Sequence, residues 1–183
     1  MNSTARIVRL SVVRVAALLD RLWRASVPLT AVGVLMLVVA GASVVGMIVD
    51  SSVIAGAPAW LKPFKFAVST AIYSLTLAWI FGYLSDWRRI RRVVGWTTAI
   101  VFVVEVAIID TQAWRGTTSH FNVSTPLDAL LFFVMGGAIL LQTLISVAVA
   151  AALWRQRFTD RTLGWALRLG MTLTIAGALA GPL

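Results

Sequence analysis

The chain has 183 residues, of which 60% are hydrophobic and only 13% charged, and its mean hydropathy is +0.90. Soluble domains carry about 25% charged residues, so this composition excludes a water-soluble monomer and indicates a membrane protein. The net charge of +9 does not indicate nucleic-acid binding, because most basic residues fall in segments expected at one membrane face. Zero cysteines and a single histidine, His120, exclude disulfides and any haem or zinc site that needs several such ligands from one chain.

Residues 1–26 are too rich in arginine to cross a membrane, but their apolar and charged side chains separate onto two faces of a helix. The apolar face holds Val8, Val12, Val15, Leu19, Leu22 and Trp23, and the charged face holds Arg6, Arg9, Arg14, Asp20, Arg21 and Arg24. This pattern predicts a basic amphipathic helix at the cytoplasmic interface, bound to anionic lipid headgroups. The alternative is a secretory signal cleaved after Ala42, which the continuing apolar run disfavours.

Five apolar runs are each long enough to cross the hydrocarbon core, which takes roughly 20 helical residues. They cover residues 27–49, 64–84, 93–114, 127–154 and 163–183. We therefore predict an all-α, polytopic transmembrane helix bundle of five spans, preceded by the interfacial helix and forming one domain over residues 1–183. The last run stops without a polar tail, so we also expect the chain to be a fragment or a truncated product.

Arginine placement predicts the orientation, because positively charged loops stay in the cytoplasm. Five arginines precede the first span, four lie between the second and third spans, and three lie between the fourth and fifth. The two other loops hold only Lys62, Lys65 and Arg115 as basic residues. We therefore expect a bacterial cytoplasmic membrane protein with its N-terminus in the cytoplasm and its C-terminus outside.

Glu105 lies about 12 residues inside the third predicted span, where a carboxylate facing lipid costs roughly 2.5 kcal/mol or more. Thr98 and Gln112 lie seven residues on either side of it, so the three residues form a polar stripe on one helix face, whereas Asp110 points the opposite way. Two interpretations stay open. Glu105 is either a proton or cation site, or a protonated acid that is hydrogen-bonded to a neighbouring helix.

The predicted outer loop 114–122 gathers the guanidinium of Arg115, the imidazole of His120, hydroxyls and an amide. Such a cluster is suited to binding an anion or shuttling protons. The alternative is an ordinary polar loop in which Asp110 or lipid phosphates pair with Arg115.

Lys62 and Lys65 lie among aromatic residues just before the second predicted span. Lysine side chains at such positions usually extend along apolar surface to the interface. The alternative is an ion pair between one of these lysines and a carboxylate in the outer half of the bundle, namely that of Asp50, Asp110 or Glu105.

Local signals also predict a helix start and close helix packing. In Thr125-Pro126-Leu127-Asp128, threonine fits the N-cap, proline the first helical position and Asp128 a capping position. Small residues in three spans allow helices to approach closely, within a compact bundle or a dimer. They are Ala42 and Gly46, Gly136 and Gly137, and the run from Gly177 to Gly181.

The segments W-L-K-P-F-K-F at residues 60–66 and R-G-T-T-S-H-F-N at residues 115–122, with Glu105 between them, resemble a group of bacterial multi-pass membrane proteins. The resemblance covers roughly residues 55–140. Members of the group are longer, so the resemblance implies a larger parent bundle, and it implies no substrate or reaction.

The leading functional hypothesis is a small transporter-like or sensor-like bundle with a polar site in its outer half. The candidate ligand or proton site residues are Glu105, Asp110, Gln112, Arg115, His120, Lys62 and Lys65. One alternative is a membrane-embedded enzyme or redox subunit completed by a missing C-terminal part or a partner, and another is a structural partner protein. No pattern assigns catalytic residues, a metal or a cofactor. The expected partners are the lipid bilayer and a second copy or another membrane protein.

Overall fold

The computed structural model describes the backbone of residues 3–180 and the side chains of residues 13–180. Within that part of the chain it contains six helices and one short hairpin, so the predicted all-α class is confirmed. Five of the helices, α2 to α6, are long and apolar enough to cross a membrane. The elements are α1 (Ser3–Ala25), α2 (Val27–Val49), β1 (Val53–Ile54), β2 (Ala57–Pro58), α3 (Leu61–Phe81), α4 (Arg88–Trp114), α5 (Pro126–Arg155) and α6 (Arg161–Ala180).

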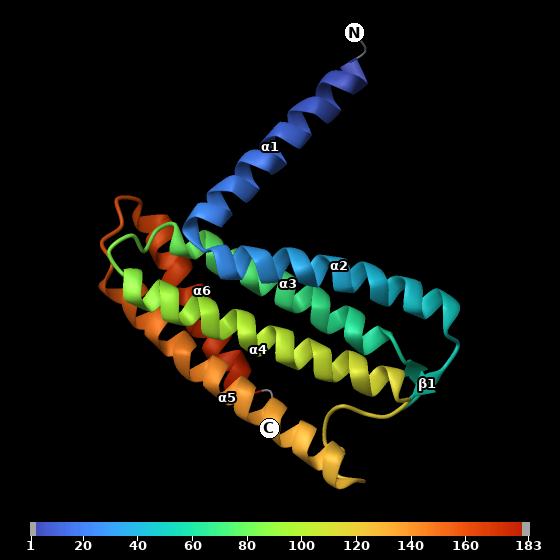
Figure 1. Ribbon diagram of the computed structural model, residues 1–183. Coiled ribbons are helices and arrows are strands. Elements are labelled where there is room, and N and C mark those ends of the chain that lie inside the picture. The colour runs from blue at the N-terminus through green and yellow to red at the C-terminus, as the bar shows by residue number, and fades with distance from the viewer. Residues whose placement is uncertain (1–2, 181–183) are drawn as a thin grey trace.

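Helix α1 projects away from the bundle, and only its C-terminal end packs against α2 and α3 (Figure 1). Leu22 is buried at this contact, whereas Val15, Leu19 and Trp23 are exposed. A helix is therefore present, but its amphipathic character and its contact with anionic lipid stay predictions. The side chains of Arg6, Val8, Arg9 and Val12, which belong to the predicted amphipathic pattern, lie outside the described residues.

The observed helices differ from the predicted spans mainly at their polar ends. Helix α2 has the predicted bounds, but α3 begins at Leu61 and α4 begins at Arg88, three and five residues before the predicted starts. Hydropathy marks where apolar sequence begins, whereas backbone hydrogen bonding continues into flanking charged turns. For the last predicted span, α6 ends at Ala180, and residues 181–183 lie outside the described part of the chain.

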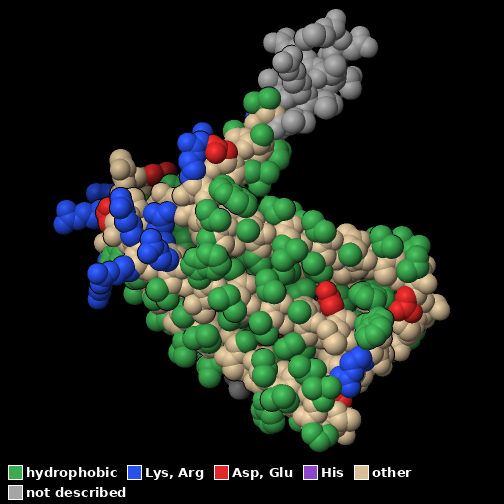
Figure 2. All heavy atoms as spheres, viewed as in Figure 1, with side chains coloured by type: hydrophobic (Ala, Val, Ile, Leu, Met, Phe, Trp, Pro, Cys, Tyr) green, Lys and Arg blue, Asp and Glu red, His purple; other side chains and the backbone are tan. Residues whose placement is uncertain are grey.

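The bundle has two chemically different ends. We call the end with the base of α1 and the α3–α4 and α5–α6 connections the arginine-rich end, because Lys and Arg side chains gather there in Figure 2. The opposite end, which we call the hairpin end, carries β1, β2 and the loop of residues 115–125 (Figure 1). Between the two ends the surface is dominated by hydrophobic side chains, as expected for helices that contact lipid.

Two glycines of α2 pack tightly against α3 and against Trp60, the residue before it. A Cβ atom at Gly33 would lie 2.7 Å from the side chain of Leu75, and one at Gly46 would lie 2.6 Å from the ring of Trp60. The close-packing role predicted for Gly46 is consistent with this contact. Gly136, Gly137 and Gly177, by contrast, face open space within the described chain, so they do not bring helices of this bundle together.

A short hairpin, which the sequence analysis did not predict, connects α2 to α3. Ala55 and Gly56 both have positive φ angles, 51° and 81°, as a two-residue type I′ turn requires. Asp50 accepts hydrogen bonds from the indole of Trp60 at 2.8 Å and from the backbone N–H of Ser52 at 2.9 Å. These bonds lower the pKa of Asp50 and fix the chain where it turns into α3.

Candidate functional site

The polar stripe predicted on α4 is buried. Thr98, Glu105 and Gln112 are each at most 1% exposed, which agrees with their seven-residue spacing along one helix face. The hydroxyl of Thr98 and both carboxyl oxygens of Glu105 have no hydrogen-bond partner among the described residues. The hydrogen bond from Glu105 to a neighbouring helix, which one of the two open interpretations requires, is therefore not formed within residues 13–180.

Gln112, at the hairpin end of the stripe, belongs to a different arrangement that we call the Asp128 clamp (Gln112, Arg115, Thr125 and Asp128). The carboxylate of Asp128 accepts from Gln112 at 2.9 Å, from Arg115 at 2.7 Å and from the hydroxyl of Thr125 at 2.6 Å. The Thr125 hydroxyl in turn accepts from the backbone N–H of Asp128, which confirms the predicted N-cap of α5. The clamp joins the end of α4 to the start of α5.

This clamp corrects the expected partner of Arg115. One of the two interpretations of this loop paired Arg115 with Asp110 or lipid phosphate, but the guanidinium pairs with Asp128 and also donates to Gln112. Arg115 precedes Asp128 by 13 residues, so only the folded loop brings them together. Asp110 is half-buried on α4, and one of its carboxyl oxygens is buried without a hydrogen-bond partner in the described chain.

The loop after α4 turns back over the helix ends because α4 stops at a glycine. Gly116 has φ of 70°, and the N–H groups of Gly116 and Thr117 donate to the carbonyls of Ala113 and Gln112. This is the Schellman pattern, which favours glycine in the left-handed region. Buried Asn122 then holds the loop by donating to the Thr117 hydroxyl and the Thr118 carbonyl.

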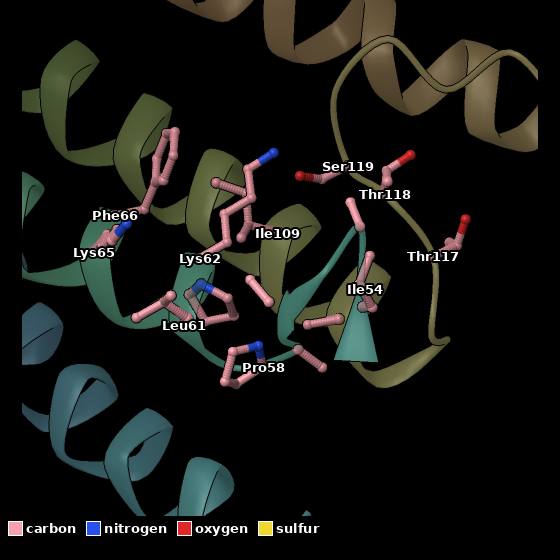
Figure 3. Close-up of a pocket in the computed structure, with 15 residues that line it drawn as sticks. Ile54, Pro58, Leu61, Lys62, Lys65, Phe66, Ile109, Thr117, Thr118 and Ser119 are labelled. Atoms are coloured by element: carbon pink, nitrogen blue, oxygen red, sulfur yellow. The ribbon is translucent and has the colours of Figure 1, made fainter. Parts of the chain in front are cut away.

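The loop and the start of α3 enclose a cavity of about 280 Å³, which we call the Lys62 cavity. In Figure 3, Lys62 extends toward Ser119, whereas Lys65 points away from the loop. The ammonium of Lys62 donates to Nδ1 of His120 at 3.0 Å and lies 5.9 Å from the centre of the Phe66 ring. No carboxylate oxygen lies within 4.0 Å of Lys62 or Lys65 in the part of the chain described, so the suggested lysine–carboxylate ion pair is not formed.

His120 is half-buried beside this ammonium. Burial lowers the pKa of His120 below its usual value of 6.5, and the positive charge of Lys62 lowers it further. The imidazole is therefore neutral at pH 7, and Nδ1 accepts from Lys62. The Phe66 ring packs against the imidazole, with 5.6 Å between ring centres. Lys62, Phe66 and His120 thus form one contacting group at the hairpin end.

A second cavity, of about 200 Å³, lies deeper between α3, α4 and α5, and we call it the Glu105 cavity. Its walls are mostly aromatic and aliphatic, and Tyr73 packs edge-on against Phe102 with 5.4 Å between ring centres. Glu105 is the only carboxylic acid among the lining residues, which are Phe66, Ser69, Thr70, Tyr73, Phe102, Glu105 and Ile139. Phe66 is shared with the Lys62 cavity.

Sequence reasoning missed a polar link between α3 and α5 beside this cavity. The Tyr73 hydroxyl lies 3.0 Å from the hydroxyl of Ser146 and accepts from the Gln142 amide at 3.3 Å. The carbonyl oxygen of Gln142 is buried without a partner among the described residues. The sequence does contain a signal for this link: Gln142 lies inside a long apolar run, and Ser146, four residues later, lies on the same helix face.

Among residues 3–180, no three His, Cys, Asp or Glu side chains lie close enough to hold a metal ion. Of the predicted site residues, the fold brings Lys62 and His120 together and places Gln112 and Arg115 in the Asp128 clamp. Comparison with protein families, curated proteins and solved structures finds no match to this chain. The resemblance of residues 55–140 to other bacterial membrane proteins therefore stays a prediction.

Proposed function

We propose that this chain is an integral protein of a bacterial cytoplasmic membrane, with the arginine-rich end in the cytoplasm and the hairpin end outside. Five apolar helices support the membrane location, and the gathering of basic residues at one end supports the orientation (Figure 2). The exposed apolar residues of α1 and its basic residues suit the interface of a leaflet rich in anionic lipid.

We further propose that the protein is a small transporter or sensor that binds the anionic group of a small solute in the Lys62 cavity. The observation that carries this proposal is a half-buried ammonium, that of Lys62, with neutral His120 as its hydrogen-bond partner and no carboxylate within 4.0 Å in the described chain. A partly desolvated cation that forms no direct ion pair favours an anionic ligand, and the charge of Glu105 acts on Lys62 only from beyond 4.0 Å. Ser119, whose hydroxyl is 3.2 Å from His120, adds a donor to the same wall.

Arg115, the other cation expected at this site, contributes structure rather than ligand binding in this proposal. Its charge is balanced by Asp128, and its position is fixed by Gln112. The positively charged residues that line the cavity are therefore Lys62 and Lys65, and Lys65 is exposed at the rim.

The test is the affinity of butyrate and inorganic phosphate for the purified protein in nanodiscs, measured by isothermal titration calorimetry. Lys62→Met should weaken binding of the preferred anion by about tenfold or more, because it removes a charge-assisted hydrogen bond worth at least about 1.4 kcal/mol. Lys65→Met is the matched control, because its ammonium points away from the loop, and it should change the affinity less than about threefold.

If Lys62→Met and Lys65→Met lose anion affinity equally, the affinity depends only on the overall positive charge, and the proposed site is wrong. Binding that Lys62→Met leaves unchanged would also contradict the proposed site. Uptake of the bound anion into proteoliposomes then distinguishes a transporter from a sensor. A transporter accumulates or exchanges the anion, whereas a sensor only binds it.

A further inference from the structure

The Lys62 cavity and the Glu105 cavity are neighbours along the bundle axis. Phe66 lines both, and it lies four residues after Lys62, which is about one turn or 6 Å deeper along α3. On the facing helix, Ile109 lines the Lys62 cavity, and Glu105 lies one turn deeper. Lys62 therefore lines one cavity and Glu105 the next, and Phe66 lines both.

The Glu105 cavity has the chemistry of a site for an organic ammonium group. The carboxyl of Glu105 is 1% exposed, and neither oxygen has a hydrogen-bond partner among the described residues. A buried carboxylate needs a cation or several donors, and the other lining side chains supply few. Phe66, Tyr73 and Phe102 add three aromatic rings, whose faces attract a desolvated ammonium.

We propose that the two cavities form one bipartite site for a small zwitterion, whose anionic group binds beside Lys62 and His120 and whose ammonium group binds beside Glu105. This inference rests on the proposed function and adds the substrate class to it. The ligand's two charges are separated by several carbon atoms, because one helical turn separates the two halves of the site. The aliphatic stretch between them contacts the ring of Phe66.

The experiment compares butyrate with 4-aminobutyrate, which share the carbon chain and the carboxylate and differ only in the amine. In the parent protein, 4-aminobutyrate should bind about tenfold more tightly or better, because the amine gains a buried ion pair and cation–π contacts. Glu105→Gln keeps the shape of the side chain and removes its charge, so it should abolish this preference without weakening the binding of butyrate. Asp110→Asn is the control, because it removes a carboxyl of α4 that lines neither cavity.

A second variant keeps the test independent of how well Glu105→Gln folds. Phe102→Leu retains the carboxyl and removes one aromatic wall, so it should lower the ratio of the 4-aminobutyrate affinity to the butyrate affinity about threefold or more. If butyrate binds through Lys62 but the amine gives no advantage, or if the advantage survives Glu105→Gln, the bipartite site is wrong and the proposed function stands. If neither compound nor phosphate binds, both proposals fail.

A phosphatidylethanolamine headgroup carries the same pair of charges, so the experiment is run in two lipid compositions. With only phosphatidylglycerol present, binding of 4-aminobutyrate should be strongest. If added phosphatidylethanolamine weakens that binding in the parent protein but not in Glu105→Gln, the lipid headgroup occupies the same bipartite site. If it does not compete, the site takes a soluble zwitterion.

Discussion

Two buried carboxyl groups of this bundle, those of Glu105 and Asp128, have opposite surroundings. Asp128 is satisfied by an amide, a guanidinium and a hydroxyl, and so it holds α4 and α5 together. Glu105 has no such partner in the described chain and lines a mostly aromatic and aliphatic cavity. An acid whose hydrogen bonds are complete stabilises the fold, whereas one without partners is free to bind a proton or a cation.

His120 should make anion binding depend on pH. Its pKa lies below the usual 6.5, so the imidazole is neutral at pH 7 and takes up a proton only in more acidic solution. Protonation adds a second positive charge beside Lys62. We therefore expect the affinity for an anion of constant charge, such as chloride or sulfate, to rise as the pH falls from 7.5 to 5. Calorimetric titration across this range is the measurement.

His120→Gln is the control for this pH dependence, because glutamine keeps a hydrogen-bonding side chain without titrating there. The same lowered pKa predicts that folding stability falls as the pH drops through the range below 6.5, because the unfolded chain then binds more protons than the folded one. If anion affinity and folding stability vary with pH in His120→Gln as they do in the parent protein, groups other than His120 cause the pH dependence.

At the scale of elements, α2 is positioned by the side chains of Leu75 and Trp60, which pack against Gly33 and Gly46. A Cβ atom added at Gly46 would lie 2.6 Å from the Trp60 ring, so Gly46→Ala must displace that ring and its bond to Asp50. We expect this change to cost about 1–3 kcal/mol of stability, as overpacking does, partly offset by the better helix propensity of alanine. Thermal unfolding in detergent is the measurement.

Gly41→Ala on the same helix is the matched variant, since nothing lies within 4 Å of a Cβ atom at that position. It should be neutral, or more stable by up to about 1 kcal/mol. The packing account of α2 is contradicted if Gly41→Ala lowers the melting temperature as much as Gly46→Ala does.

Helices α3 and α5 are linked beside the Glu105 cavity by the hydroxyls of Tyr73 and Ser146. Interhelical hydrogen bonds in membrane proteins contribute about 0.6 kcal/mol on average, so we expect a coupling free energy of about 0.5–1.5 kcal/mol between Tyr73→Phe and Ser146→Ala. A double-mutant cycle on unfolding measures this coupling. A coupling of zero would show that the two hydroxyls bond to other groups.

For the whole molecule, the unequal charge of the two ends predicts the topology. Residues 1–183 include no cysteine, so single cysteines can be placed at two exposed loop positions. Thr118→Cys at the hairpin end should react with a membrane-impermeant maleimide in intact cells, and Ser85→Cys at the arginine-rich end should react only after lysis. The reverse labelling pattern would invert the orientation and place the Lys62 cavity in the cytoplasm.

The sequence predicted those features that depend on residues close together along the chain. Five apolar runs, the polar stripe of Thr98, Glu105 and Gln112, and the Thr125 cap of α5 all follow from helical periodicity and local hydrogen bonding, and the structure contains each of them. The apolar runs predicted the starts of α3 and α4 three and five residues too late, because both helices begin in polar or charged sequence before the apolar run.

Contacts between distant segments were decided only by the tertiary structure. Lys62 is hydrogen-bonded to His120, 58 residues away, and Tyr73 is hydrogen-bonded to Ser146, 73 residues away. Arg115 forms its ion pair with Asp128 rather than with Asp110. Periodicity fixes which face of a helix a residue occupies but not which helix lies opposite, because many packings of five apolar helices bury similar surface. The sequence therefore determined that Glu105 faces protein, and the packing of α3, α4 and α5 determined that it lines a mostly aromatic and aliphatic cavity without a partner among the described residues.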